Sequence, residues 1–148
     1  MLLLSDVSIP QLRDLLVQRG LRLQLVPGGD DIPGSFWGPP EAGLIAGTVY
    51  ARADTPVHSL LHEAAHLLVM PEDRRANVHT DASDSLAEED AACYLQILLA
   101  DQIDGAGSDR LMADMDAWGY TFRLGSARAW FEHDATEAQQ FLDERGIA

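Results

Sequence analysis

Alternating and helical patterns of apolar residues divide the chain into a sheet region and a following helical region. Apolar residues recur at helical spacing over residues 8–20, which predicts a helix with Ser8 as its N-cap. Residues 21–26 alternate between apolar and polar and predict a strand, and residues 44–52 are the clearest second strand. A shorter strand is expected over residues 34–38. Together these segments predict a small antiparallel sheet.

The most continuous apolar stretch, residues 57–70, predicts a helix that is buried in the core. Its apolar side chains lie on nearly all sides, as in a helix that packs on several neighbours at once. We expect Thr55 to be its N-cap, Pro56 to lie in its first turn and Pro71 to end it.

The rest of the chain is predicted to be mainly helical. A polar connection over residues 72–85 leads to a second apolar helix over residues 85–101, where Ser85 and Glu88 form a capping-box pattern. Further elements are expected later: helices over residues 108–118, 125–133 and 136–145, and a short extended segment over residues 120–124. The pattern therefore predicts one α+β domain over residues 1–148, with the sheet packed on the helix at 57–70.

Composition narrows the function classes that this domain could serve. The net charge is −14 and all ten basic residues are arginine, so no lysine nucleophile exists and nonspecific binding to nucleic acid is disfavoured. The single cysteine, Cys93, cannot form an intramolecular disulfide, and we expect it to be a small core residue. The sequence has no convincing signal peptide and no apolar run long enough to span a membrane, so a cytoplasmic protein is expected.

The predicted buried helix carries an HExxH motif, His62-Glu63-Ala64-Ala65-His66. Residues four apart lie one above the other on a helix, so His62 and His66 can direct two imidazoles at one metal ion. Glu63 is rotated about 100° from His62. Its carboxylate can therefore reach a zinc-bound water instead of the metal, which is the position of a general base.

A catalytic zinc takes three protein ligands and keeps one position open for water. The helix over residues 85–101 can supply the third ligand, because Glu88 and Glu89 are acids near the start of an otherwise apolar helix. A carboxylate on a buried helix needs a cation or a hydrogen-bond donor. His79 or an aspartate is the remaining alternative.

Two segments resemble the ImmA/IrrE-type zinc metallopeptidases. Residues 55–68, TPVHSLLHEAAHLL, resemble that family's HExxH helix, and residues 88–99, EEDAACYLQILL, resemble its second helix, of the form ExEANxFAxxLL. The resemblance implies a zincin-like fold, in which His62, His66 and a glutamate bind zinc and Glu63 is the catalytic base.

The aligned register favours Glu88 as the glutamate ligand, and Asp90 then matches the family's second glutamate. The face of Glu88 continues through Ala91, Leu95 and Leu98, whereas Glu89 shares a face with Ala92, Cys93 and Gln96. The sequence departs from the family at Ala92, where the family has Asn or Asp, so any contribution from that side chain is lost. Glu88 and Glu89 therefore both stay open.

Other polar and aromatic residues have plainer interpretations. His58 is expected to be an outer-sphere or surface histidine, because the ends of a row of residues i, i+4 and i+8 lie ~12 Å apart along one helix. Phe36 and Trp37 are expected to be packing residues instead of a platform for a ligand. Tyr120 or His79 could steady an oxyanion, judged from side-chain type alone. For Arg123 and Arg128, pairing with the excess acid is favoured over binding a substrate carboxylate.

These features together predict a zinc-dependent metallopeptidase that hydrolyses a peptide bond in a protein or peptide substrate. The alternative is a zinc-binding domain without catalytic activity that acts as a regulatory or protein-interaction module. A metal-free interaction domain with incidental histidines is a third, weaker interpretation.

Overall fold

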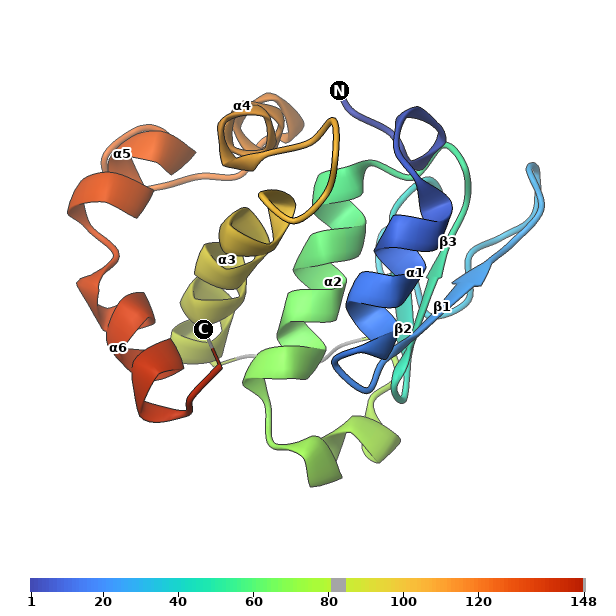
Figure 1. Ribbon diagram of the computed structural model, residues 1–148, viewed down its shortest axis with the longest axis horizontal. Coiled ribbons are helices and arrows are strands. Elements are labelled where there is room, and N and C mark those ends of the chain that lie inside the picture. Colours follow the sequence, from blue (N-terminus) through green and yellow to red (C-terminus); the bar gives the residue numbers. More distant parts are fainter. Residues whose placement is uncertain (81–84, 148) are drawn as a thin grey trace.

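Helix α2 (Val57–Val69) lies at the centre of the computed structural model, which describes residues 1–80 and 85–147. A three-stranded sheet and helix α1 (Ile9–Val17) lie on one side of α2, and helix α3 (Leu86–Ala100) packs along the other side (Figure 1). Part of the polar connection predicted over residues 72–85 lies outside the described residues. The predicted α+β class is confirmed.

The sheet is mixed, with strand order β1-β3-β2, so the prediction of an antiparallel sheet is wrong in part. Strand β1 (Arg22–Leu25) runs parallel to β3 (Thr48–Ala51), and only β2 (Gly43–Ile45) is antiparallel to β3. The single strand predicted over residues 44–52 is in fact the β2–β3 hairpin. The chain reverses there because Ala46 has a φ of 52° and the flexible Gly47 follows.

The strand predicted over residues 34–38 is absent, and this part of the described chain is a series of turns. Gly34 and Gly38 have φ values of 73° and 86°, which extended backbone does not allow. The carbonyl of Gly34 instead accepts a hydrogen bond of 3.2 Å from the Leu44 amide, which attaches the loop to β2. Phe36 and Trp37, which were expected to be packing residues, contact each other but lie outside the core, because their exposed fractions are 65% and 78%.

The predicted helices form, with differences at their ends. The Ser8 hydroxyl caps α1 and the Ser85 hydroxyl caps α3, as predicted. Helix α2 has no side-chain cap: its N-cap is Pro56, and the Thr55 hydroxyl accepts a hydrogen bond of 2.9 Å from the Arg52 amide. The last turn of α2 is stabilised differently, by the Arg75 guanidinium, which donates to the Leu67 carbonyl at 2.9 Å.

Two of the remaining helices pack on α3. The described residues also form two 3-10 helices, η1 (Leu4–Asp6) and η2 (Glu72–Asn77). Three further α-helices follow α3: α4 (Ser108–Trp118), α5 (Ala127–His133) and α6 (Thr136–Glu144). Helices α4 and α6 both contact α3. Arg123 pairs with Asp134, and Arg128 pairs with Asp109 at 2.7 Å, so both arginines bind acids at the surface. None of the helices in the described part of the chain is long and apolar enough to cross a membrane.

The close approach of the loop to β2 predicts a sharp effect at Gly34. A Cβ at this position would lie 2.3 Å from the Leu44 carbonyl oxygen, which is backbone and cannot move aside cheaply. Gly29 has a similar positive φ, but a Cβ there would meet no atom within 4 Å, so it is a matched control for backbone strain alone. We expect Gly29→Ala to cost roughly 1 kcal/mol of unfolding free energy and Gly34→Ala clearly more. Urea denaturation measures both, and equal losses would contradict the close contact.

Candidate metal centre

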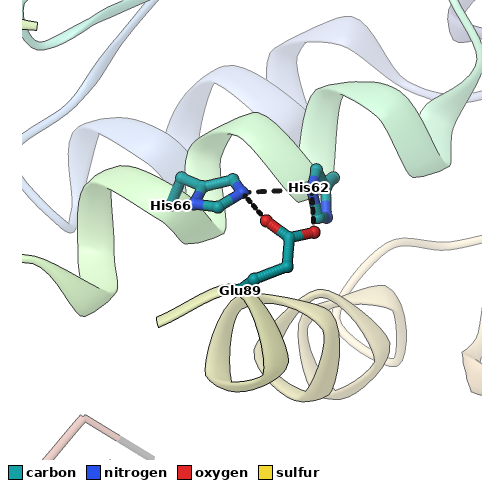
Figure 2. Close-up of side chains that lie close together, drawn as sticks. All are labelled: His62, His66 and Glu89. Carbon is teal, nitrogen blue, oxygen red and sulfur yellow. Dashed lines mark hydrogen bonds and ion pairs between the residues drawn. The ribbon is translucent and has the colours of Figure 1, made fainter. Parts of the chain in front are cut away.

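Three side chains from two helices converge between α2 and α3 (Figure 2). The Nε2 atoms of His62 and His66 are 3.1 Å apart. The carboxylate of Glu89 contacts both rings, with one oxygen 3.1 Å from His62 Nε2 and the other 2.7 Å from His66 Nε2. We call these three residues the triad. Their ligand atoms all lie within 4.8 Å of one another and could hold a metal ion.

The helical spacing of the motif explains the first half of this geometry. His62 and His66 are one turn apart on α2, so their rings lie on the same side and face α3 (Figure 2). The side chain of His66 is 6% exposed and that of His62 is 14% exposed. Two largely buried imidazoles with converging nitrogens need a proton or a cation between them, because their lone pairs otherwise repel.

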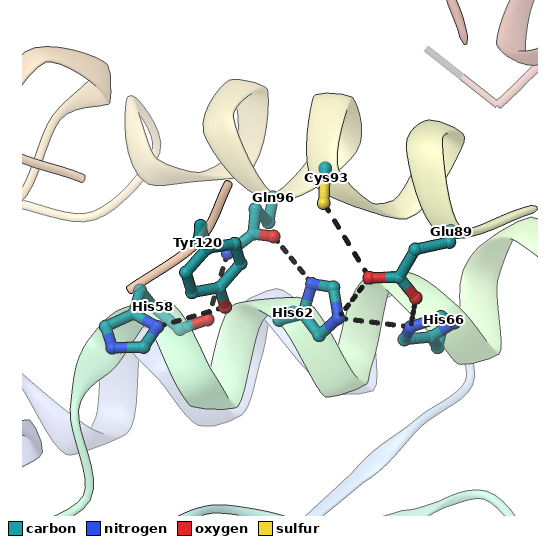
Figure 3. Close-up of polar contacts among 7 residues, drawn as sticks. All are labelled: His58, His62, His66, Glu89, Cys93, Gln96 and Tyr120. Carbon is teal, nitrogen blue, oxygen red and sulfur yellow. Dashed lines mark hydrogen bonds and ion pairs between the residues drawn. The ribbon is translucent and has the colours of Figure 1, made fainter. Parts of the chain in front are cut away.

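The third member of the triad is Glu89, not Glu88, which the aligned register favoured. The Glu88 carboxylate turns away from the histidines and accepts hydrogen bonds of 3.2 Å from the Arg74 guanidinium. One residue along a helix changes the direction of a side chain by about 100°. The face of α3 that meets α2 is therefore the one that carries Glu89, Cys93 and Gln96 (Figure 3).

A buried glutamine, which was not predicted, orients the first histidine. Gln96 is fully buried, and its side-chain oxygen lies 2.7 Å from Nδ1 of His62 (Figure 3). Its side-chain nitrogen donates to the backbone carbonyl of His58 at 3.1 Å, which fixes the amide with its oxygen towards His62. His62 must then donate from Nδ1, which leaves Nε2 as the ring nitrogen that faces Glu89 and that would bind a metal ion once it is deprotonated.

His58 lies outside the triad, as its position in the row predicted, and it is buried instead of exposed. Its Nδ1 atom is 3.1 Å from the hydroxyl of Tyr120. Burial, and then the nearby charge of His62, lower the pKa of His58 to about 4, so this ring is neutral at pH 7. Burial likewise raises the pKa of Tyr120 to about 12, which keeps its phenol protonated.

The triad opens onto a pocket of about 600 Å³. Glu63 and Tyr120 line this pocket together with His62, His66 and Glu89. Burial raises the pKa of the Glu63 carboxyl, against the opposing effect of His62 and His66. The pKa of Glu89 is instead held far below its usual range: burial alone would raise it, but the hydrogen bonds from His62 and His66 outweigh that effect. The Glu89 carboxylate therefore contacts the imidazoles, and the Glu63 carboxyl faces the pocket.

The donor set and its spacing could hold a metal ion. Two ligand atoms bound at 2.0–2.1 Å to one four-coordinate ion lie about 3.3 Å apart. The two imidazole nitrogens are 3.1 Å apart, which is close to this value, and with one ligand atom taken from each residue all three lie within 4.8 Å of one another. The pocket supplies the open side that a bound ion would need for a further ligand.

The other candidate residues lie around the triad. Cys93 is buried, as predicted, but its sulfur is 3.9 Å from a Glu89 oxygen and so borders the centre. His79 is exposed, with Nδ1 3.0 Å from the Thr80 hydroxyl, and it is not part of the pocket lining. Tyr120 is therefore the better placed of the two residues considered for an oxyanion.

Comparisons of the chain with family models, curated proteins and solved structures give no match. The chemistry of the centre is therefore inferred from its own residues. A pair of imidazoles, a carboxylate and a free carboxylate in one pocket are together suited to metal-assisted hydrolysis.

The geometry predicts that Glu89→Gln removes metal binding and Glu88→Gln does not. Glu88 is the matched control, because it is the adjacent acid on α3 and contacts Arg74 instead of the histidines. We expect Zn²⁺ affinity to fall in Glu89→Gln by more than the roughly 100-fold that loss of an outer hydrogen bond costs. Titration against a competing chelator measures this affinity. Equal losses in both variants would contradict the assignment of the triad.

The hydrogen bond between Gln96 and His62 predicts that changes at Gln96 alter the affinity for Zn²⁺. Gln96→Leu removes the acceptor for His62 Nδ1, and we expect Zn²⁺ affinity to fall about 10- to 100-fold. Gln96→Glu keeps an acceptor, so affinity should return to the wild-type value or exceed it, although the carboxylate then faces the His58 carbonyl and lowers the melting temperature. Unchanged affinity in a folded Gln96→Leu protein would show that Gln96 does not orient His62.

Proposed function

We propose that the protein is a zinc-dependent peptidase with a zincin-like catalytic centre. The observation that carries this proposal is the convergence of His62, His66 and Glu89 at a pocket that Glu63 also lines. Two imidazoles and one carboxylate with an open side are the donor set of catalytic zinc sites. The resemblance of residues 55–68 and 88–99 to the ImmA/IrrE-type metallopeptidases supports the same reaction and a protein or peptide substrate.

In this proposal, His62, His66 and Glu89 hold the ion and Glu63 is the general base. Zinc bound there supplies Lewis acidity, which polarises a carbonyl group and lowers the pKa of water. The Glu63 carboxylate takes a proton from the attacking water and delivers it to the nitrogen of the departing amine. Its raised pKa makes it a stronger base than an exposed glutamate, and so suits both transfers.

Tyr120 orients the substrate carbonyl in the same proposal. Its phenol stays protonated across the physiological range and lies against the pocket, where it can donate a hydrogen bond to an oxygen that becomes negative. Neutral His58 holds the phenol in place through the 3.1 Å contact with its hydroxyl. Both residues therefore act on the same oxygen atom, Tyr120 directly and His58 by positioning.

Glu63→Gln tests the base. This change keeps the size of the side chain but removes the proton acceptor, so we expect hydrolysis of a casein-type protein substrate or a peptide library to fall at least about 100-fold. Zinc content should stay at that of the wild-type protein, because Glu63 is not a member of the triad. Atomic absorption and a fluorescent-peptide assay measure the two quantities on one preparation.

Two results would count against the proposal. Full activity in Glu63→Gln would mean that another group takes the proton. A wild-type protein that binds zinc but cleaves nothing in the library would favour the alternative of a regulatory or protein-interaction module.

A further inference from the structure

Two large aromatic side chains stand exposed at the pocket of the metal centre. Phe36 and Trp37 have exposed fractions of 65% and 78%, and both line the same pocket as Glu63 and the triad. Their rings are nearly perpendicular, at 80°, with centroids 4.8 Å apart, which is a favourable edge-to-face arrangement. Exposed aromatic groups in a concave site usually mark a surface that another molecule covers.

A third aromatic residue extends this surface. Trp118, at the end of α4, is 39% exposed and lines the same pocket. Its indole Nε1 donates to a Glu41 carboxylate oxygen at 2.9 Å, and its ring lies 5.2 Å from that of His58. The hydrogen bond and the ring contact hold the indole in place, and 39% of Trp118 stays exposed at the pocket.

The loop that carries Phe36 and Trp37 is anchored at both ends. The Gly34 carbonyl accepts from the Leu44 amide at 3.2 Å, on the sheet side. On the other side, the Ala42 amide donates to the buried hydroxyl of Ser59, on α2, at 3.0 Å. The aromatic pair is therefore fixed relative to the helix of the HExxH motif, and a ligand would bind without ordering the loop first.

The charge of the pocket restricts the ligand further. Glu41, Glu63 and Glu89 all line it, and none of its described lining residues is a lysine or an arginine. Three carboxylates against one divalent ion leave the pocket with a formal charge of −1, so an acidic side chain would be repelled. A large, uncharged apolar group satisfies both the aromatic surface and the charge.

We propose that Phe36, Trp37 and Trp118 form a substrate subsite for a large apolar side chain, aromatic or leucine-like, of a peptide that is bound at the metal centre. This inference rests on the proposed peptidase function and names its substrate class. The subsite selects peptides whose scissile bond lies next to such a side chain and rejects those with an acidic residue there.

Binding of capped pentapeptides tests the subsite without cleavage. The probes are alanine peptides with Phe, Ala or Glu at the central position, and they are titrated into the Glu63→Gln protein in zinc-containing buffer. We expect the Phe peptide to bind about tenfold more tightly than the Ala peptide. The Glu peptide should bind less tightly than the Phe peptide, because its side chain adds no apolar contact and still faces Glu41 and Glu89. Adding Phe36→Ser and Trp37→Ser should reduce the preference for Phe to within about twofold.

The control variant is Leu124→Ser, which removes an apolar side chain that is 48% exposed and is not part of this pocket lining. It should keep the full preference for Phe. The subsite would be overturned if the Glu63→Gln protein showed no preference for the Phe peptide, or if that preference survived the loss of both Phe36 and Trp37. A wild-type dimer that Trp37→Ser dissociates would also overturn it, because a second copy would then be the occupant of this surface.

Cleavage by the protein with Glu63 intact separates the subsite from the proposed function. Hydrolysis of the Phe peptide with a higher kcat/KM than the Ala peptide, lost in the double aromatic variant, supports both. Binding preference without hydrolysis of any peptide supports the subsite and rejects the peptidase. Hydrolysis with no dependence on Phe36 and Trp37 rejects the subsite and leaves the peptidase in place.

Discussion

The contact of one carboxylate with two imidazoles, across the interface of α2 and α3, is the interaction on which the rest of the site depends. Both helices are largely buried, and polar groups between them are costly unless they satisfy one another or bind a cation. Glu89 is a polar partner for both His62 and His66, because each of its oxygens contacts one ring.

Outward from this contact, the polar groups form a connected set (Figure 3). Gln96 links the His62 ring to the backbone of His58, and the His58 ring reaches Tyr120 at the pocket. Two buried ring nitrogens, Nε2 of His58 and Nδ1 of His66, have no hydrogen-bond partner among the described residues. His66 thus directs only its other nitrogen into a polar contact, the one that faces the centre. The connected polar groups therefore lead to the place where Nε2 of His62 and Nε2 of His66 contact the Glu89 carboxylate.

The sequence was most informative for features that depend on the regular spacing of residues within a single helix. Helices α2 and α3 were predicted because apolar stretches of this length with polar ends rarely form anything but a buried helix. The pairing of His62 with His66 followed from their spacing of four residues. The sheet was predicted less well. Its parallel pairing depends on where β1 lies relative to a distant hairpin, and no local pattern encodes that distance. The turn at Ala46 and Gly47 was hidden inside an apolar run that fits a single strand equally well.

The choice between Glu88 and Glu89 shows why the site was only partly predictable. Both are acids near the start of α3, and the capping pattern and the resemblance both directed attention to Glu88. The decisive signal lay further along the helix. Gln96 is a polar residue in an apolar stretch, seven positions after Glu89, so the two lie on one face. A buried polar side chain on an apolar helix needs a partner, and the face that carries it is therefore the face that meets other polar groups. On that reasoning, the position of Gln96 selects Glu89, and it does so without any knowledge of where the histidines lie.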